Sequence, residues 1–262
     1  MKKFIFYVLC FFVSVQLHSQ NKYSKTFDRI KTSYDQNKLT SLVSEFSQRQ
    51  IRLKNEAETY ARINNIPIRY EKEDGTLLEL QYITEDGIPI YYTTFNVDAA
   101  ISTRTNFLNS DGGLGLALNG DDLTAHVWDG GLARDTHQEY DGSGGDNRFS
   151  IGDASTTLNF HAAHVTGTIM ASGVVADAKG MAWQADAVGY DWNNDESEAV
   201  AAAAAGMLLS NHSYGYRLRD DDDQVLLPPI YLGGYINVSR NWDNIMYNAP
   251  YYLMVVAAGN DG

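Results

Sequence analysis

The stretch "LTAHVWDGG", residues 123–131, joins an apolar run to an aspartate and two glycines. Three further apolar runs follow it: "ADAVGYDW" (185–192), "GMLLSNHSYG" (206–215) and "YYLMVVAAGNDG" (251–262). Their length and composition predict buried strands. Between these runs we expect helices over residues 161–172, 195–206 and about 237–247. Strands that alternate with helices predict an α/β fold with a doubly wound, mostly parallel sheet.

A smaller α+β unit is predicted ahead of this sheet, over residues 21–105. Apolar residues recur there at helical spacing at Leu39, Leu42, Val43 and Phe46. Short apolar runs then alternate with Asp74-Gly75 and Asp86-Gly87, which are strong hairpin signals. The sequence therefore predicts a helix followed by an antiparallel meander. The larger α/β domain is expected over residues 106–262.

Residues 1–20, "MKKFIFYVLCFFVSVQLHSQ", have two lysines, an apolar run and a polar end. This layout is typical of a cleaved signal peptide, and the run is short for a membrane span. We therefore expect a secreted, extracellular or cell-surface protein without stable membrane insertion. Cys10 is the one cysteine of the chain, so no internal disulfide is expected.

The charge of the chain is distributed unevenly. Residues 21–110 hold 12 acidic and 12 basic side chains, whereas residues 111–262 hold 21 acidic against 6 basic. Nucleic acid is an unfavourable partner for such an acidic surface, because phosphate binding requires clustered cations.

Several polar residues lie where the predicted parallel strands end. They are Asp129, the run Ser213, Tyr214 and Gly215, and Asn260, and His161 opens the helix that follows the first strand. Sites in parallel sheets form at the carboxyl ends of strands. A carboxylate that orients an imidazole and an amide that binds an oxyanion are components of nucleophilic acyl transfer.

In these motifs the chain resembles the subtilisin family of serine proteases. "VWDGG" is similar to the aspartate motif of that family, and "HAAHVTGTIMA" is similar to its histidine motif. "SNHSYG" resembles the strand that pairs with substrate, and "VVAAGNDG" resembles the strand that carries the oxyanion asparagine. The order of aspartate before histidine, with serine last, is also that of the family.

The resemblance implies a serine endopeptidase that acts on protein or peptide substrates as a monomer and requires no cofactor. Asp129 would orient His161, the general base, while Asn260 would bind the oxyanion. Ser213, Tyr214 and Gly215 would align the substrate backbone. Residues 21–105 occupy the place of a propeptide, and structural calcium is an option that the family often uses.

The chain also departs from the family pattern. Gly130 stands in place of a serine or threonine, and Ala162 and Ala163 stand in place of glycine and threonine. Tyr214 stands in place of leucine and could reshape the substrate subsites. No Gly-Thr-Ser-x-Ala motif occurs in the 262 residues. We therefore expect the nucleophilic serine beyond residue 262, the peptidase domain being incomplete here.

Other interpretations of the same residues remain open. The chain could be a non-catalytic relative that acts as a binding module or scaffold. His161 and His164 could be packing residues of a helix, or ligands in a metal-dependent hydrolase, although no third ligand lies near them in the sequence. The acidic run from Asp220 to Asp223 is a solvated loop or a calcium loop, and no metal ligand is assigned.

Overall fold

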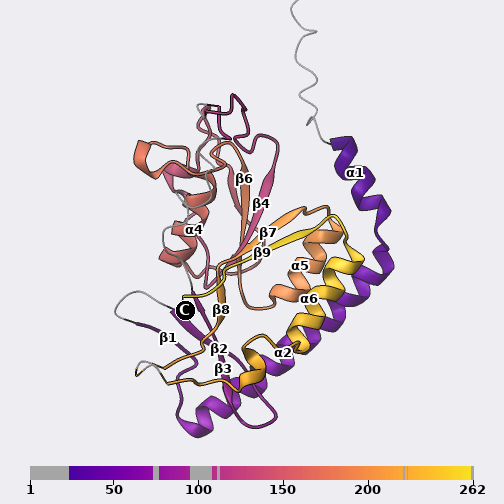
Figure 1. Ribbon diagram of the computed structural model, residues 1–262, viewed down its shortest axis with the longest axis vertical. Coiled ribbons are helices and arrows are strands. Elements are labelled where there is room, and N and C mark those ends of the chain that lie inside the picture. The colour runs from indigo at the N-terminus through magenta and orange to yellow at the C-terminus, as the bar shows by residue number, and fades with distance from the viewer. Residues whose placement is uncertain are drawn as a thin grey trace, which may run out of the picture.

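The computed structural model describes residues 24–72, 77–94, 108–110, 113–220, 222 and 224–260 (Figure 1). The predicted signal peptide, the Asp74-Gly75 turn and the boundary between residues 105 and 106 lie outside this range. No helix in the described part of the chain is long and apolar enough to cross a bilayer.

The larger sheet is parallel throughout and has the strand order β5-β6-β4-β7-β9. Its strands are β4 (Thr124–Asp129), β5 (Phe149–Ile151), β6 (Asp186–Asp191), β7 (Leu209–His212) and β9 (Leu253–Val256). Helix α4 (Phe160–Met170) covers one face, and α5 (Asp195–Ala204) and α6 (Asn237–Asn248) cover the other (Figure 1). The predicted α/β class, with helices on both faces of a parallel sheet, is confirmed.

The smaller sheet is antiparallel and combines both predicted regions of the chain. Its order is β1-β2-β3-β8, where β1 is Arg69–Glu71, β2 is Leu77–Ile83, β3 is Pro89–Thr94 and β8 is Tyr214–Tyr216. The Asp86-Gly87 hairpin is confirmed, with Gly87 in a left-handed conformation at φ +80°. The single strand predicted over 206–215 is wrong, because the chain leaves the parallel sheet at Ser213 and continues as β8.

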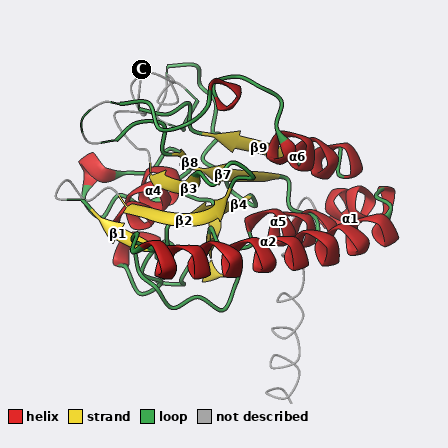
Figure 2. Cartoon of the chain, turned by 90° about the horizontal axis from the view of Figure 1, so that it is seen from below, coloured by secondary structure: helices red, strands yellow, loops and turns green. Residues whose placement is uncertain are grey.

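In the part of the chain that the structure describes, helices α1 (Ser24–Ser33) and α2 (Gln36–Asn64) precede the smaller sheet. Asp35 caps α2 by accepting the backbone N–H of Lys38 at 3.0 Å. Helix α2 packs along α5, as Figures 1 and 2 show. The described residues also contain the short 3-10 turns η2 (Gln138–Tyr140), η3 (Ala176–Ala178) and η4 (Pro229–Tyr231).

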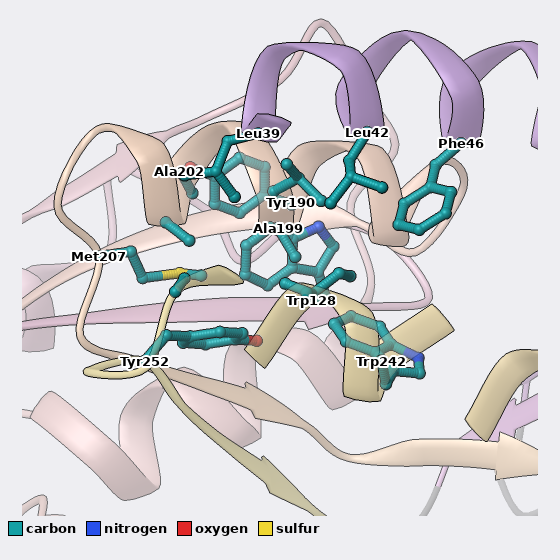
Figure 3. Close-up of a cluster of buried hydrophobic side chains, with 14 of the residues drawn as sticks. Leu39, Leu42, Phe46, Trp128, Tyr190, Ala199, Ala202, Met207, Trp242 and Tyr252 are labelled. Carbon is teal, nitrogen blue, oxygen red and sulfur yellow. The ribbon is translucent and has the colours of Figure 1, made fainter. Parts of the chain in front are cut away.

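One apolar core joins the N-terminal region to the parallel sheet. Leu39, Leu42 and Phe46 of α2 belong to the same buried cluster as Trp128 of β4 and Trp242 of α6 (Figure 3). The indole of Trp128 also stacks on the rings of its neighbours in β6 and β7, with a centroid distance of 4.1 Å to Tyr190. Although the regions differ in charge, their interiors are continuous.

Two details differ from the predictions. β5 was not predicted, since three residues beside a glycine-rich loop carry no periodicity. β9 is apolar but not buried: Leu253 is 61% exposed and Val256 is 53% exposed. Within the described residues β9 is an edge strand that pairs only with β7, so its composition indicated the strand correctly but not its environment.

The shared core predicts that Leu42→Ala destabilises the whole protein. The Leu42 side chain is fully buried, and truncation of such a leucine costs about 2–5 kcal/mol through lost burial and cavity formation. We expect one cooperative denaturant transition, shifted to lower concentration. Ile63→Ala, at a position 78% exposed on the same helix, is the matched control. It should change the free energy of unfolding by under about 0.5 kcal/mol. Separate transitions for the two regions would contradict a continuous core.

Candidate active site

Asp129 is the last residue of β4, at the carboxyl edge of the parallel sheet, and it is fully buried. Its Oδ1 accepts the backbone N–H of Gly130 at 2.7 Å. Gly131, with φ +147°, turns the chain away, and a Cβ there would lie 2.8 Å from the carbonyl oxygen of Thr157. The second glycine of "VWDGG" is therefore required by a close approach of two backbone segments.

A backbone clamp holds the segment after Asp129 against the segment before His161. Leu132 and Leu158 form a parallel bridge. The N–H of Leu132 donates to Thr157 O at 2.8 Å, and the N–H of Asn159 donates to Leu132 O at 2.9 Å. The clamp fixes where α4 begins relative to the end of β4.

Asn159 is the N-cap of α4. Its Oδ1 accepts the backbone N–H groups of His161 at 2.8 Å and Ala162 at 3.2 Å, which satisfies donors that a helix start leaves unpaired. The sequence analysis missed this residue. The signal that could have found it is an asparagine directly before a helical run.

The structure brings Asp129 and His161 into direct contact. His161 Nδ1 lies 2.8 Å from Oδ2 and 3.0 Å from Oδ1 of Asp129. Because a carboxylate accepts hydrogen bonds, Nδ1 is the protonated nitrogen of the neutral ring and Nε2 is its basic nitrogen. His161 Nε2 is buried and has no hydrogen-bond partner among the described residues. The pair therefore presents one basic nitrogen that no other side chain among the described residues uses.

Burial raises the pKa of Asp129, and the hydrogen bonds from His161 and Gly130 oppose that rise. An isolated buried carboxylate is costly, but a positive imidazole beside it compensates the charge in a medium of low dielectric. The Asp129 carboxylate thus lies directly against the Nδ1 side of the His161 ring and holds the ring in one orientation.

Ser213 lies between β7 and β8, and its Oγ accepts the side-chain N–H of Asn211 at 2.9 Å. The Tyr214 ring, at a position that is 5% exposed, points into the core and not toward solvent. Gly215 is paired in antiparallel register with Thr93 of β3. The N-terminal region therefore occupies the strand edge that was predicted to align a substrate.

Asn260 follows β9 and is exposed. Trp128, His212 and Val256 are register neighbours on β4, β7 and β9, so Asp129, Ser213 and the start of the loop to Asn260 share one edge of the sheet. In the described part of the chain no hydrogen bond joins Asn260 to the Asp129–His161 pair. The structure thus places Asp129, Ser213 and the start of the loop to Asn260 at one edge of the parallel sheet, Tyr214 and Gly215 in the antiparallel sheet, and Asp129 in direct contact with His161.

The remaining histidines on α4 and nearby have different surroundings. His164 is exposed, whereas His161 is buried. His137 Nδ1 accepts the N–H of Glu139 at the start of η2. Among the described residues no group of three or more His, Cys, Asp or Glu side chains is arranged to hold a metal ion.

The acidic run is a tight turn in its described part. Asp220 Oδ1 accepts the backbone N–H groups of Asp222 and Gln224 at 3.0 and 2.8 Å, and a bridge between Arg219 and Val225 closes the turn. Asp221 and Asp223 lie outside the described residues. Structural calcium stays a prediction.

Glu139 is a second residue that the sequence analysis missed. Its carboxylate accepts the backbone N–H groups of Gly173, Val174 and Val175 at 2.8, 3.0 and 2.8 Å. Although burial favours the neutral form, these bonds lower the pKa of Glu139 below its ordinary value. Glu139 therefore ties the loop after α4 to η2. An acidic residue in a polar stretch carries no sequence signal for this role.

Comparison of the chain with protein-family models, curated proteins and solved structures finds no match. The site is therefore interpreted below from its geometry and from the motifs of the sequence.

Loss of the cap should weaken the start of α4. We expect Asn159→Ala to lower the free energy of unfolding by about 1 kcal/mol, the usual cost of removing an N-cap side chain. Asn159→Asp, which keeps an acceptor oxygen, should retain most of the stability. Thermal unfolding of both variants measures the difference. Equal losses in the two variants would show that an acceptor oxygen at this position does not stabilise the start of α4.

Glu139 predicts a specific pH dependence of stability. The pKa of Glu139 is lower in the folded protein than its unfolded value of about 4.5. The Glu139 carboxylate therefore stabilises the fold above pH 4.5, and this stabilisation is lost as the pH falls through the lower pKa of the folded protein. Glu139→Gln should lower the free energy of unfolding near neutral pH by about 1–3 kcal/mol and flatten its decline below pH 4.5. Chemical unfolding across this range tests it, with Glu45→Gln at an exposed position as the control. Identical pH profiles for wild type and Glu139→Gln would refute it.

Proposed function

We propose that this chain belongs to a secreted serine endopeptidase of the subtilisin type, whose nucleophilic serine lies beyond residue 262. The observation that carries the proposal is the buried hydrogen bond between His161 Nδ1 and Asp129, at 2.8 Å, beside an unpartnered Nε2. Its position at the carboxyl edge of a parallel sheet supports the same interpretation.

In the proposed reaction His161 Nε2 accepts the proton of the serine hydroxyl as the serine oxygen bonds to the substrate carbonyl carbon. Asp129 stabilises the imidazolium and keeps the ring oriented, without taking the proton. His161 then returns the proton to the departing amine as the C–N bond breaks, and water hydrolyses the acyl-enzyme. Asn260 would donate its amide N–H to the oxyanion of the tetrahedral intermediate.

The proposal assigns residues 21–105 as a propeptide. The antiparallel pairing of β3 with β8 supports this, because β3 lies where Ser213, Tyr214 and Gly215 would align a substrate strand. Arg69 adds a second contact beside the site, since its guanidinium donates to Gly130 O at 2.6 Å. The N-terminal region would have to leave before a substrate could use this edge.

The remaining parts of the proposal follow the sequence motifs. The substrates are proteins or peptides, the enzyme is a monomer that requires no cofactor for its chemistry, and structural calcium is an option. Residues 1–20 direct export, so the mature enzyme acts outside the cell or at its surface.

The test is labelling of the complete gene product with a fluorophosphonate, which reacts with an activated serine. We expect the wild type to be labelled after removal of the propeptide and His161→Ala not to be. His164→Ala, an exposed change on the same helix, is the matched control and should keep its labelling. Asp129→Asn should retain the fold but lower kcat by roughly 10⁴-fold, because the ring loses its oriented tautomer.

Two results would support other functions. A folded, propeptide-free wild type that is not labelled would contradict the proposal and favour a non-catalytic binding or scaffold protein. Peptidase activity that a chelator abolishes, in the absence of labelling, would instead indicate metal-dependent hydrolysis.

A further inference from the structure

A second buried histidine, His212, lies in a continuous chain of hydrogen bonds that the proposed reaction does not use. Ser210 Oγ lies 2.6 Å from Tyr252 Oη and 2.8 Å from His212 Nε2. On the other side of the ring, His212 Nδ1 lies 2.8 Å from Tyr214 Oη, which lies 2.8 Å from Asp195 Oδ2. All five residues are at most 5% exposed. Burying a polar group lowers the stability of the fold unless the group has a hydrogen-bond partner.

The direction of each hydrogen bond in the chain follows from its end at Asp195. Above its pKa Asp195 is an acceptor, and its Oδ1 also accepts N–H groups from Gln50 and Glu196, both at 2.7 Å. Tyr214 Oη therefore donates to Asp195 and accepts from His212 Nδ1–H. Burial lowers the pKa of His212 to about 3, so its ring is neutral and Nε2 accepts from Ser210. Ser210 in turn accepts from Tyr252, and no group in the chain lacks a partner.

This series of hydrogen bonds holds the backbone at Ser213, where the polypeptide passes from the parallel sheet to the antiparallel sheet. His212 and Tyr214 flank Ser213, and their side chains are joined on the core side. On the opposite side, Asn211 donates to Ser213 Oγ, as the alternation of side chains along a strand predicts. Ser213 is therefore held by its own hydrogen bond from Asn211 and by the hydrogen bond that joins its two neighbours, His212 and Tyr214.

We propose that His212, Tyr214 and Asp195 are positioning residues that fix the strand Ser213–Gly215 for a substrate. The inference rests on the proposed function, in which this strand pairs with the substrate backbone. Such pairing requires backbone donors and acceptors held in register before the substrate arrives. The Tyr214 hydroxyl is the link, because it connects β8 to the helix start at Asp195 and to β7 at His212.

The test is steady-state kinetics of the mature enzyme on a peptide that spans several residues before the cleaved bond. The assay pH should lie above the pKa of Asp195, which burial and the charge of Glu196 raise to about 7. We expect Tyr214→Phe to raise KM roughly tenfold, the effect of one lost hydrogen bond to a charged group, with kcat within about twofold. Labelling by a small fluorophosphonate should be unchanged, since the probe does not pair with the strand.

Tyr252→Phe is the matched control, because it also removes one buried hydroxyl but leaves the bonds from Ser210 to Asp195 intact. It should leave KM unchanged even if it lowers stability. The inference would be overturned if KM changed equally in both variants, or if it did not change in Tyr214→Phe. Labelling of the wild type would still support the proposed function in either case. Absence of labelling in the wild type would count against that function instead.

A second pair of variants applies if Tyr214→Phe does not fold. Asp195→Asn keeps an oxygen that can accept the Tyr214 hydroxyl and should hold KM within about twofold, whereas Asp195→Ala removes the acceptor and should raise it roughly tenfold. Equal KM values for these two variants would contradict the positioning role.

Discussion

The buried hydrogen bond between Asp129 and His161 is the constraint around which the described site is organised. A fully buried carboxylate is tolerated only if its charge is compensated. Here the compensation comes from the backbone N–H of Gly130 and from the imidazole on α4. These two donors come from segments that meet only because the clamp at Leu132 and the cap at Asn159 fix the start of α4. Local backbone geometry thus determines the geometry of the pair.

The N-terminal region extends this arrangement and fits the glycine at position 130, where the motif that the sequence resembles has a serine or threonine. A Cβ at Gly130 would lie 2.4 Å from Cδ2 of Leu77 and 3.1 Å from the indole of Trp192. The space that a serine or threonine would occupy is therefore filled by β2. Beside it, Glu79 of the same strand accepts the indole N–H of Trp192 at 2.8 Å and pairs with Lys54 at 2.7 Å. The two regions are fitted to each other next to the site by the packing of Leu77 and by the hydrogen bond between Trp192 and Glu79.

The sequence was sufficient for features that repeat along the chain and insufficient for those that depend on distant partners. Apolar runs indicated β4, β6, β7 and β9, and the motif order indicated that Asp129 and His161 meet. The break at Ser213 was not predictable, because β8 is defined by pairing with β3, more than a hundred residues earlier. Glu139 was missed for a related reason: its partners are backbone N–H groups, which every residue but proline has, so composition does not mark it. Asn159 could have been found, because an asparagine directly before a helical run is an N-cap signal.

The contrast between His161 and His212 shows what a structure adds to a motif. His161 opens α4 and His212 ends β7, and both are buried near the carboxyl edge of the parallel sheet. Both nitrogens of His212 are hydrogen-bonded, and burial lowers its pKa, so the ring remains neutral. His161 has one nitrogen held by a carboxylate and the other without a partner in the described chain. A fully paired ring positions its neighbours, whereas a ring paired on one side only is able to accept a proton from a third group.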